Sequence, residues 1–571
     1  MRTELKPWRL KFDTHSSIES IQALGYSRVM SELLAHRNLC TQEEISRFLQ
    51  PKLKSLSDPF MLPAMQAAVD RILAAAQAGE KVAIFGDYDV DGVTSVSFLV
   101  RLLEAYGIDV CWGIPRRQGE TYGLNQETLD RAFYSKGEQF SLMIAVDCAT
   151  NAYDEIESLY QNGVETIVID HHEVLETQHS QGLVALVNPK VEEGNEFTYL
   201  CTVGLIFKLG HALLKQSPLD SIDLKDYLDL VAMGTIADMS PLIGDNRILA
   251  VQGFEQLKKT KHLGLRSLMK LSMIENLQFE DIGFKLSPKI NSAGRLYTAD
   301  TAVEMVLSKE NTDAFSKAEL LHNYNEERKI CEAGIVEQAR QMYESSPEMK
   351  QQTVIVLGSP DWNSGVIGIV ASRLSMQYQK PCFIIAFEED GIGKGSGRSV
   401  GDVSLIDSIA ACQDSLIDGG GHKMAAGIRL KVDDLAKFRQ QFHDYVYTQQ
   451  QSTALLLQSK IDVEVQLSEL TLDFLDEYEQ LNPFGVGNPK PQFLARKLYN
   501  ASPERWLKDG QHLKLSLTQD NFQGKIDAIY FNAGREHITS GPWDIAFNVS
   551  RNTFRNRNYL QLVVQKMWAS E

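Results

Sequence analysis

The stretch KVAIFGDYDVDG, residues 81–92, joins an apolar run to three aspartates at alternate positions. Residues 82–85 have the composition of a strand that is buried on both faces. Asp87, Asp89 and Asp91 follow this run directly. Like charges a few ångström apart raise one another's pKa, so such a cluster needs a compensating charge. We therefore expect a cation to bind where this strand ends.

Further short apolar runs with polar ends follow as far as about residue 240. They are SLMIAVD, ETIVIDHH and LVALVN, and each is followed by a helix-like segment or a loop. Strands that alternate with helices predict a parallel sheet of the βαβ kind. Ligands of such sheets collect outside the carboxyl ends of the strands. The charged residues at these ends are therefore candidates for one shared site.

The candidate ligands are carboxylates and imidazoles. Asp147 lies in IAVDCAT, and Asp170, His171 and His172 lie in IVIDHHEV. Asp238 lies in AMGTIADMSPL, which we also place at the end of a strand or in a loop. Carboxylates with one or two imidazoles and no thiolate suit Mn²⁺ or Mg²⁺. Two such ions activate a shared water and neutralise a phosphoryl group, so the pattern indicates a phosphoesterase.

Length and composition limit the class of protein. At 571 residues the chain is too long for one core and should form about three or four domains. No apolar run reaches the roughly 20 residues that span a bilayer, and the first residues lack the apolar core of a secretion signal, so we expect a cytoplasmic protein. The net charge is −18, yet Lys and Arg outnumber Asp and Glu by 12 to 7 from Lys490 to Glu571. Only this last part has the charge of a polyanion-binding domain.

The residue patterns divide the chain into five segments. The glycine-rich stretches GIGKGSGRS at 391–399 and DGGGHKMAAG at 418–427 indicate loops of a second α/β domain. Alternating short strands near the end indicate a small β-barrel or sandwich. We expect a helical segment at 1–75, a parallel-sheet α/β domain at 76–297, connecting helices at 298–350, the second α/β domain at 351–455 and the β-barrel at 456–571.

Several motifs together resemble those of a known family. The DHH phosphoesterase superfamily has four motifs, which resemble GDYDVDG at 86–92, VD at 146–147, DHH at 170–172 and GTIADMSPL at 234–242. From about residue 25 onward the chain is similar to the RecJ exonuclease family, through INSAGRL at 290–296, GSGRS at 395–399, GGGHKMAAG at 419–427 and NPFGVGNPKPQF at 482–493. The resemblance implies a DHH catalytic domain, a DHH-associated domain and an OB-fold.

The same resemblance implies roles for the charged side chains. Asp147 would bridge two metal ions. Asp87 would be an additional ligand or would orient one, and His172 would act on the scissile phosphate as a general acid or electrostatic donor. The other ligands would be Asp89 for the first ion, and Asp91, His171 and Asp238 for the second.

The resemblance also implies contacts with a nucleic acid. Arg117 would bind the phosphate at a 5′ end, and Tyr122 would stack on a base. Ser396 and Arg398 in the second α/β domain would bind phosphate, because a guanidinium group can donate two parallel hydrogen bonds to a phosphate. The remaining expected contacts are Asn291, Arg295 and His422.

The implied activity is a 5′ to 3′ exonuclease on single-stranded DNA that releases 5′-mononucleotides with Mn²⁺ or Mg²⁺. The implied context is recombinational and mismatch repair beside the single-strand binding protein and a RecQ-type helicase, with the chain as a monomer. Two alternatives stay open. One is a DHH phosphodiesterase for short RNA or cyclic dinucleotides, and the other is a replication scaffold that keeps the fold without catalysis.

Overall fold

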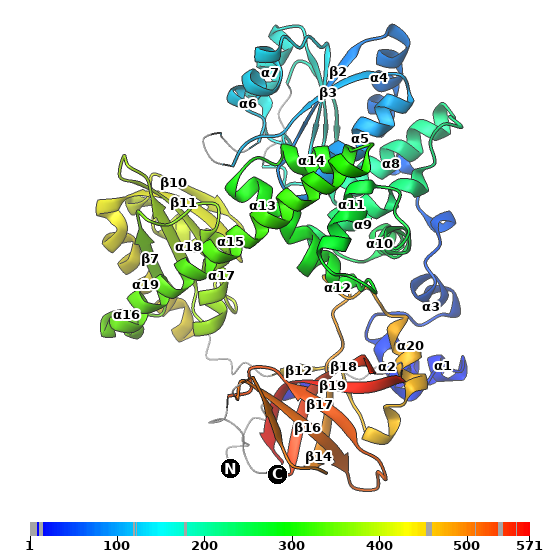
Figure 1. Ribbon diagram of the computed structural model, residues 1–571, viewed down its shortest axis with the longest axis vertical. Coiled ribbons are helices and arrows are strands. Elements are labelled where there is room, and N and C mark those ends of the chain that lie inside the picture. The colour runs from blue at the N-terminus through cyan, green and yellow to red at the C-terminus, as the bar shows by residue number, and fades with distance from the viewer. Residues whose placement is uncertain are drawn as a thin grey trace. The chain divides into compact units, whose positions relative to one another are not determined.

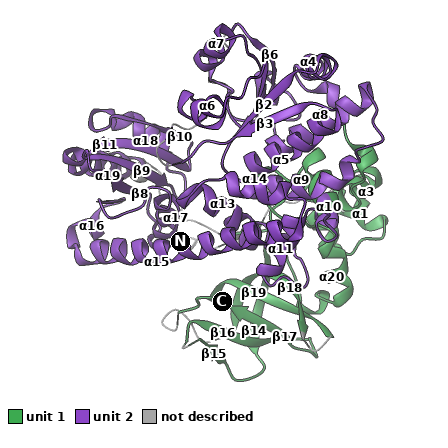
Figure 2. Cartoon of the chain, turned by 45° about the horizontal axis from the view of Figure 1, so that its top comes forward, with its two compact units in different colours: residues 1–57, 239–252, 456–571 green, residues 58–238, 253–455 purple. Residues whose placement is uncertain are grey.

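The structure is a computed structural model that describes residues 8–10, 15–117, 120, 123–175, 180–452, 459–508, 510–534, 541–554 and 557–570. Contacts within the chain divide it into two compact units, which Figure 2 shows in green and purple. Unit 1 comprises residues 1–57, 239–252 and 456–571, and unit 2 comprises residues 58–238 and 253–455.

Unit 2 contains a five-stranded sheet in the order β3-β2-β4-β5-β6, and every strand pair in it is parallel (Figure 1). This confirms the predicted parallel sheet. The strands are β2 Lys81–Gly86, β3 Asp109–Gly113, β4 Leu142–Val146, β5 Glu165–Ile169 and β6 Leu183–Val187. The edge strand β3 was not predicted, because the apolar run in its sequence DVCWG is short and its residues are mostly half-exposed.

Helices cover both faces of this sheet, which is why its inner strands β2, β4 and β5 are almost entirely buried. Successive strand side chains point to opposite faces. Phe85 and Ala145 belong to a core cluster with Phe133 and Ile156, on the face covered by α6 Gln126–Ala132 and α7 Tyr153–Gln161. The other face packs against α4 Met65–Ala78, α5 Val90–Ala105 and α8 Thr202–Gln216.

A series of helices links this domain to the second sheet. The expected long connecting helix is α15 Asn311–Ser345, which has 35 residues. In the part of the chain that the structure describes, no helix, α15 included, is long and apolar enough to cross a membrane. The other helices of the series are α9 Leu228–Ala237, α11 Leu263–Leu271, α12 Phe279–Asp281, the π-helix η6 Ile282–Leu286, α13 Ser287–Leu296, α14 Asp300–Leu307 and α16 Pro347–Gln351. Helix α10 Gly244–Leu257 begins in unit 1 and ends in unit 2.

The second sheet corrects one expectation, because both glycine-rich stretches that were predicted as loops form strands. A Cβ at Gly397 would lie 2.3 Å from Phe383, and one at Gly393 would lie 2.6 Å from Phe387. The glycines therefore let these rings lie flat on β9, a packing that local sequence statistics do not reveal. The sheet order is β10-β11-β9-β8-β7, with β7 Ile355–Ser359, β8 Cys382–Phe387, β9 Ile392–Arg398, β10 Asp418–Gly421 and β11 Ala425–Lys431. Its helices are α17 Ile367–Tyr378, α18 Leu405–Ala411 and α19 Leu435–Ser452.

Unit 1 is built on the predicted C-terminal barrel. Strand β14 pairs with both β18 and β16, so that β14, β18, β19, β17 and β16 form a closed ring. These strands are β14 Phe493–Asn500, β16 His512–Gln519, β17 Ile526–Tyr530, β18 Trp543–Phe554 and β19 Arg557–Ala569. Short strands β13 Val463–Glu464 and β15 Arg505–Leu507 extend the ring, and β1 Trp8–Leu10 pairs with β12 Ser459–Ile461. The helices of unit 1 include α1 His15–Ala23, α2 Arg28–Ala35, α3 Gln42–Leu49 and α20 Leu472–Glu479.

Candidate active site

The first three aspartates lie where β2 passes into α5. Asp89 is the N-cap of α5, and its Oδ1 accepts hydrogen bonds from the backbone N–H groups of Asp91 (2.8 Å) and Gly92 (3.2 Å). A Cβ at Gly92 would lie 2.3 Å from the Asp87 carbonyl oxygen, so only glycine allows the chain to turn this tightly. The turn thus brings Asp87 and Asp89, which precede α5, close to Asp91 in the first turn of that helix.

All six expected metal ligands lie close together with His172, in three overlapping groups. Within each group, one possible ligand atom from each side chain lies within 4.8 Å of the others. Asp147 belongs to two groups and His171 to two, as a site for a pair of ions would require. The groups are Asp87, Asp89 and Asp147; Asp91, His171 and Asp238; and Asp147, His171 and His172.

Asp238 reaches the site from an element that was not expected. The sequence placed it at the end of a strand or in a loop, whereas it is the C-cap of helix α9. That helix, LDLVAMGTIA, is apolar on nearly all sides and almost wholly buried, so its periodicity does not separate a helix from a buried strand. The correction concerns the element alone, since Asp238 Oδ1 still lies 3.9 Å from His171 Nε2.

Helix α8 fixes two of the carboxylates. The backbone N–H groups of Thr202 and Val203, at its first turn, donate to the two oxygens of Asp91 at 2.7 and 2.9 Å. The Thr202 hydroxyl donates to Asp147 Oδ1 at 2.8 Å. Backbone N–H groups at a helix N-terminus stabilise an anion. Thr202 thus orients two candidate ligands at once, a role that sequence reasoning missed.

The loop after β4 has an unusual backbone. Asp147 has a φ of 62° and Ala149 a φ of 73°, both in the left-handed region. Aspartate tolerates this conformation better than alanine, whose Cβ clashes there. Strain of this kind persists only where the surroundings enforce it. Here it turns the Asp147 carboxylate toward His171, whose Nε2 lies 3.4 Å away.

Asp170 does not join the ligand groups but holds His172. Its Oδ1 lies 2.7 Å from His172 Nδ1, and its Oδ2 accepts from the Thr150 hydroxyl at 2.6 Å. Although burial disfavours both charges, the hydrogen bond between them lowers the pKa of Asp170 and raises the pKa of His172 to about 9. The raised pKa favours the protonated form of His172, in which the ring is a hydrogen-bond donor, and its side chain is 42% exposed.

The aspartate cluster is electrostatically strained in the absence of a cation. Burial, together with the charges of Asp89 and Asp147, raises the pKa of Asp87 well above its usual range. Burial and the Asp147 charge raise the pKa of Asp89 to about 6, and the same two causes raise that of Asp91. Asp87 Oδ1 is buried and has no hydrogen-bond partner among the described residues. The carboxylate oxygens of this cluster outnumber the hydrogen-bond donors around them, and Mn²⁺ or Mg²⁺ would bind such oxygens.

Adding Mn²⁺ to protein treated with EDTA is therefore expected to raise its melting temperature by about 5 °C, and more at pH 7.5 than at pH 5. The folded-state pKa of Asp89 is raised, so the metal-free protein loses stability as the pH rises toward and through about 6. The ion replaces bound protons, so its affinity rises over the same range. Thermal unfolding in EDTA and in Mn²⁺ from pH 5 to 8 checks this. An equal shift at both ends of that range would contradict it.

A cavity of about 260 Å³ adjoins the first ligand group. Its basic wall carries Arg117 and Arg295, and the Arg117 guanidinium lies 4.6 Å from the ring centre of Tyr88. Asn291 Oδ1 is buried there, and no described residue donates a hydrogen bond to it. The sequence did not single out Tyr88, although it lies between two of the aspartates. The full lining is Asp87, Tyr88, Asp89, Arg117, Asn291 and Arg295.

Arginines of both α/β domains gather beside this cavity. Arg295 Nη1 donates to the carbonyl of Gly365 at 3.0 Å. Burial, with the charge of Arg117 next in size, lowers the pKa of Arg295 to about 10 and also lowers the pKa of Arg398. Cations that repel one another in a buried place form a site for anions such as phosphate.

The remaining expected contacts are Ser396, Arg398, His422 and Tyr122. Ser396 and Arg398 alternate with the buried glycines of β9, and a Cβ at Gly368 near the start of α17 would lie 2.9 Å from Ser396 Oγ. His422 is exposed between β10 and β11, and its charge contributes to lowering the pKa of Glu173, after the hydrogen bond from Lys190. Tyr122 lies outside the described residues.

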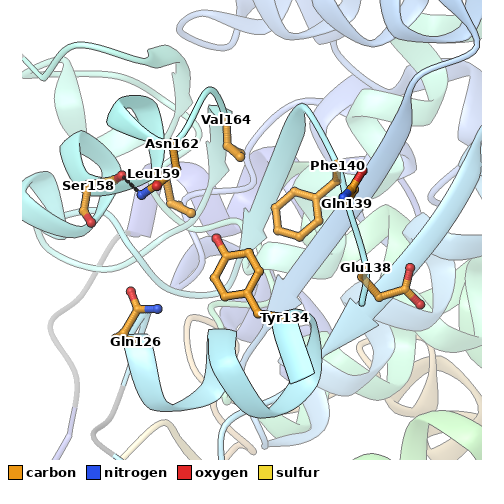
Figure 3. A pocket seen from close by; sticks show the side chains of 9 residues that line it. All are labelled: Gln126, Tyr134, Glu138, Gln139, Phe140, Ser158, Leu159, Asn162 and Val164. Carbon is orange, nitrogen blue, oxygen red and sulfur yellow. Dashed lines mark hydrogen bonds between the residues drawn. The ribbon is translucent and has the colours of Figure 1, made fainter. Parts of the chain in front are cut away.

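A second cavity, of about 540 Å³, lies at the opposite edge of the first sheet (Figure 3). Phe140 and Val164 precede strands β4 and β5, so this cavity is at their amino ends. Among its described lining residues the one acid is Glu138, which pairs with Lys81, and there is no arginine. This composition separates it from the carboxylate site.

Known protein families match three parts of the chain. They are the DHH family N-terminal domain at residues 81–235, the DHHA1 domain at 351–448 and the RecJ OB domain at 461–566. The fold and the carboxylate site are thus those of a DHH-family protein with an added OB domain.

Similar proteins and a similar solved structure identify the family within the DHH class. The chain is 33% identical to the single-stranded-DNA-specific exonuclease RecJ of Bacillus subtilis (strain 168), over 99% of this chain and 71% of that one. It is 30% identical to RecJ of Dickeya dadantii (strain 3937), over 95% and 96%. The structure of RecJ from Thermus thermophilus in complex with Mn²⁺ has a TM-score of 0.83 at 26% identity, over 99% of this chain and 80% of that one. The chain belongs to the RecJ family.

Proposed function

We propose that the protein is a metal-dependent exonuclease that degrades single-stranded DNA from its 5′ end and releases 5′-mononucleotides. One observation carries this proposal: the ligand groups adjoin a cavity whose basic wall holds Arg117, Asn291 and Arg295. Carboxylates alone would bind ions, and the arginines add a place for phosphates. The names of the RecJ relatives support single-stranded DNA as the substrate.

In this proposal Asp147 would be a ligand of both of two Mn²⁺ or Mg²⁺ ions. Bound there, they would lower the pKa of a shared water and neutralise the phosphoryl oxygens during an in-line displacement. Thr202 holds Asp147 and Asp91 in place, so these ligands need no rearrangement to bind. The other ligands would be Asp87 and Asp89 on one side, and Asp91, His171 and Asp238 on the other.

His172 acts on the phosphodiester. Asp170 fixes its ring through Nδ1 and keeps it protonated near neutral pH. A cationic imidazole donates a hydrogen bond to the scissile phosphate, or a proton to the leaving oxygen, when the transition state develops charge.

The arginine cluster explains why degradation starts at an end. Arg117, Ser396 and Arg398 bind the terminal 5′ phosphate, and Asn291 and Arg295 bind the backbone beyond it. Tyr122 stacks on a base, and His422 contacts a phosphate from the second domain. A channel lined in this way accepts one strand and excludes a duplex.

We also propose the wider assignment that this function implies. The catalytic domain is 76–297, and the substrate-binding domain is 351–455, joined to it by the helices of 298–350. The OB domain, 456–571, binds single-stranded DNA, and 1–75 is a helical segment. The protein is a cytoplasmic monomer that works in recombinational and mismatch repair with the single-strand binding protein and a RecQ-type helicase.

The deciding experiment uses oligonucleotides labelled at the 5′ or the 3′ end, single- and double-stranded, with Mn²⁺ and then with EDTA. The expected result is early release of the 5′ label as mononucleotide from the single strand, and no release in EDTA. Early release of the 3′ label, or equal attack on blunt duplex, would refute the polarity or the strand preference. Cleavage of dinucleotides alone would favour the short-RNA or cyclic-dinucleotide alternative.

A further inference from the structure

The π-helix η6 carries an aromatic side chain that the site described above leaves unexplained. Phe284 is 82% exposed, which makes it the most exposed aromatic residue among the described residues. Its neighbours Ile282 and Leu286 are fully buried, so the segment itself is firmly packed. π-Turns are uncommon and occur frequently at functional sites. Presenting a phenyl ring to water costs free energy that a ligand would recover.

The position of η6 connects Phe284 to the active site at two points. On one side η6 packs against α9, where a Cβ at Gly283 would lie 4.0 Å from Ile236, two residues before Asp238. On the other side η6 runs directly into α13, which carries Asn291 and Arg295. Helix α13 also packs against α15, as Figure 1 shows.

Helical geometry places Phe284 on the same side of this segment as the cavity residues. Asn291 and Arg295 are four positions apart and so share a face of α13. When the positions are counted back from Arg295 through the wider π-turn, position 284 lies within about 40° of Arg295 around the helix axis. The rise from 284 to 291 is about 10 Å at about 1.5 Å per residue. Phe284 therefore continues the line of the two phosphate-contacting residues, away from the 5′ phosphate site.

The surroundings of Phe284 suit a polyanion. Lys285, whose side chain is half-exposed, follows Phe284 directly, whereas Lys289 is buried and its Nζ donates to the Lys285 carbonyl at 2.9 Å. Lys329 of α15 is close enough for its charge, with burial as the larger cause, to lower the pKa of Lys289. Two acids partly offset this charge, because Asp281 pairs with Lys285 and Glu326 with Lys329, both at 2.8 Å.

We propose that Phe284 is a stacking platform for one base of single-stranded DNA, on the 3′ side of the scissile phosphate. The ligand is a nucleobase, since an exposed ring beside lysines binds single strands through stacking plus backbone charge. A stacked strand advances about 3.4 Å per nucleotide, so the base lies about three nucleotides from the phosphate bound at Asn291. The platform would hold the next linkage in register after each mononucleotide leaves. This inference rests on the proposed function.

The test is equilibrium binding of a 5′-phosphorylated oligonucleotide in EDTA, where no turnover occurs, followed by fluorescence anisotropy. The probes lack one base at position 2, 3, 4 or 5 from the 5′ end. With the wild-type protein, one of these abasic probes is expected to bind about tenfold more weakly than the intact strand. The Phe284→Ala substitution should weaken binding of the intact strand about tenfold. The variant should then bind the abasic probe and the intact strand with equal affinity. Phe284→Trp should restore the wild-type pattern.

Controls separate stacking from folding and from the proposed function. Met376, 70% exposed on α17, gives a matched variant, and Met376→Ala should bind as the wild type does. Because Phe284 is exposed, its truncation should leave the melting temperature unchanged. If Phe284→Ala binds the intact strand as the wild type does, or keeps the abasic penalty, the platform is refuted while the nuclease assignment stands. If the wild-type protein binds no single strand, the proposed function fails first.

Discussion

Asp147→Asn is expected to reduce turnover of single-stranded DNA by at least about 10³-fold while leaving the metal-free protein folded. Asparagine keeps the size of the side chain and can still accept the hydrogen bond from Thr202. It also tolerates the φ of 62° at this position. The change removes one negative charge from the residue that two ligand groups share, so both ions would lose a ligand.

A second readout distinguishes loss of the site from loss of the fold. The Asp147 charge contributes to the raised pKa values of Asp87, Asp89 and Asp91, so its removal relieves repulsion. The variant should melt in EDTA at or above the temperature of the wild type, and Mn²⁺ should no longer raise that temperature. Asp154→Asn, an exposed acid in the first turn of α7, is the control and should behave as the wild type. Activity within tenfold of wild type would disprove the bridging role.

The strand-end acids could be predicted because local pattern and topology agree for them. Strands β2, β4 and β5 each contain a continuous apolar run, and parallel strands bring their carboxyl ends to one edge. Asp87, Asp147 and His171 therefore converge without any long-range information. Asp238 was placed correctly near the site but on the wrong element, because a helix buried on all sides has no polar face to reveal its period.

What the sequence did not reveal depends on contacts between distant residues. Thr202 binds Asp91 across 111 positions and Asp147 across 55, and a threonine at the start of a helix otherwise predicts only a local cap. The glycines of β9 indicate loops until Phe383 and Phe387 are seen to lie against them. Phe284 was overlooked because an aromatic residue in an apolar context is usually core, and only the structure shows it exposed.

Asp170→Asn is expected to lower the rate about 10- to 100-fold at pH 8 and to shift the alkaline limb of the pH–rate profile downward. The Asp170 carboxylate raises the pKa of His172 to about 9, so the protonated ring persists until the pH rises through that value. Without the charge, the pKa of His172 falls toward the ordinary value of about 6.5. The variant should then lose its cationic donor as the pH rises above about 6.5, and the two enzymes should differ least near pH 6.

The control for this variant is Glu173→Gln. Glu173 stands one residue after His172, is exposed and pairs with Lys190, so its removal takes away the same charge without touching the Asp170–His172 hydrogen bond. Its pH–rate profile should match that of the wild type. Equal loss at pH 6 and pH 8 in Asp170→Asn would mean that Asp170 only supports the loop through Thr150. In that case His172 would act through its position alone, because a structural defect lowers the rate at every pH whereas a lost proton lowers it only where the ring is neutral.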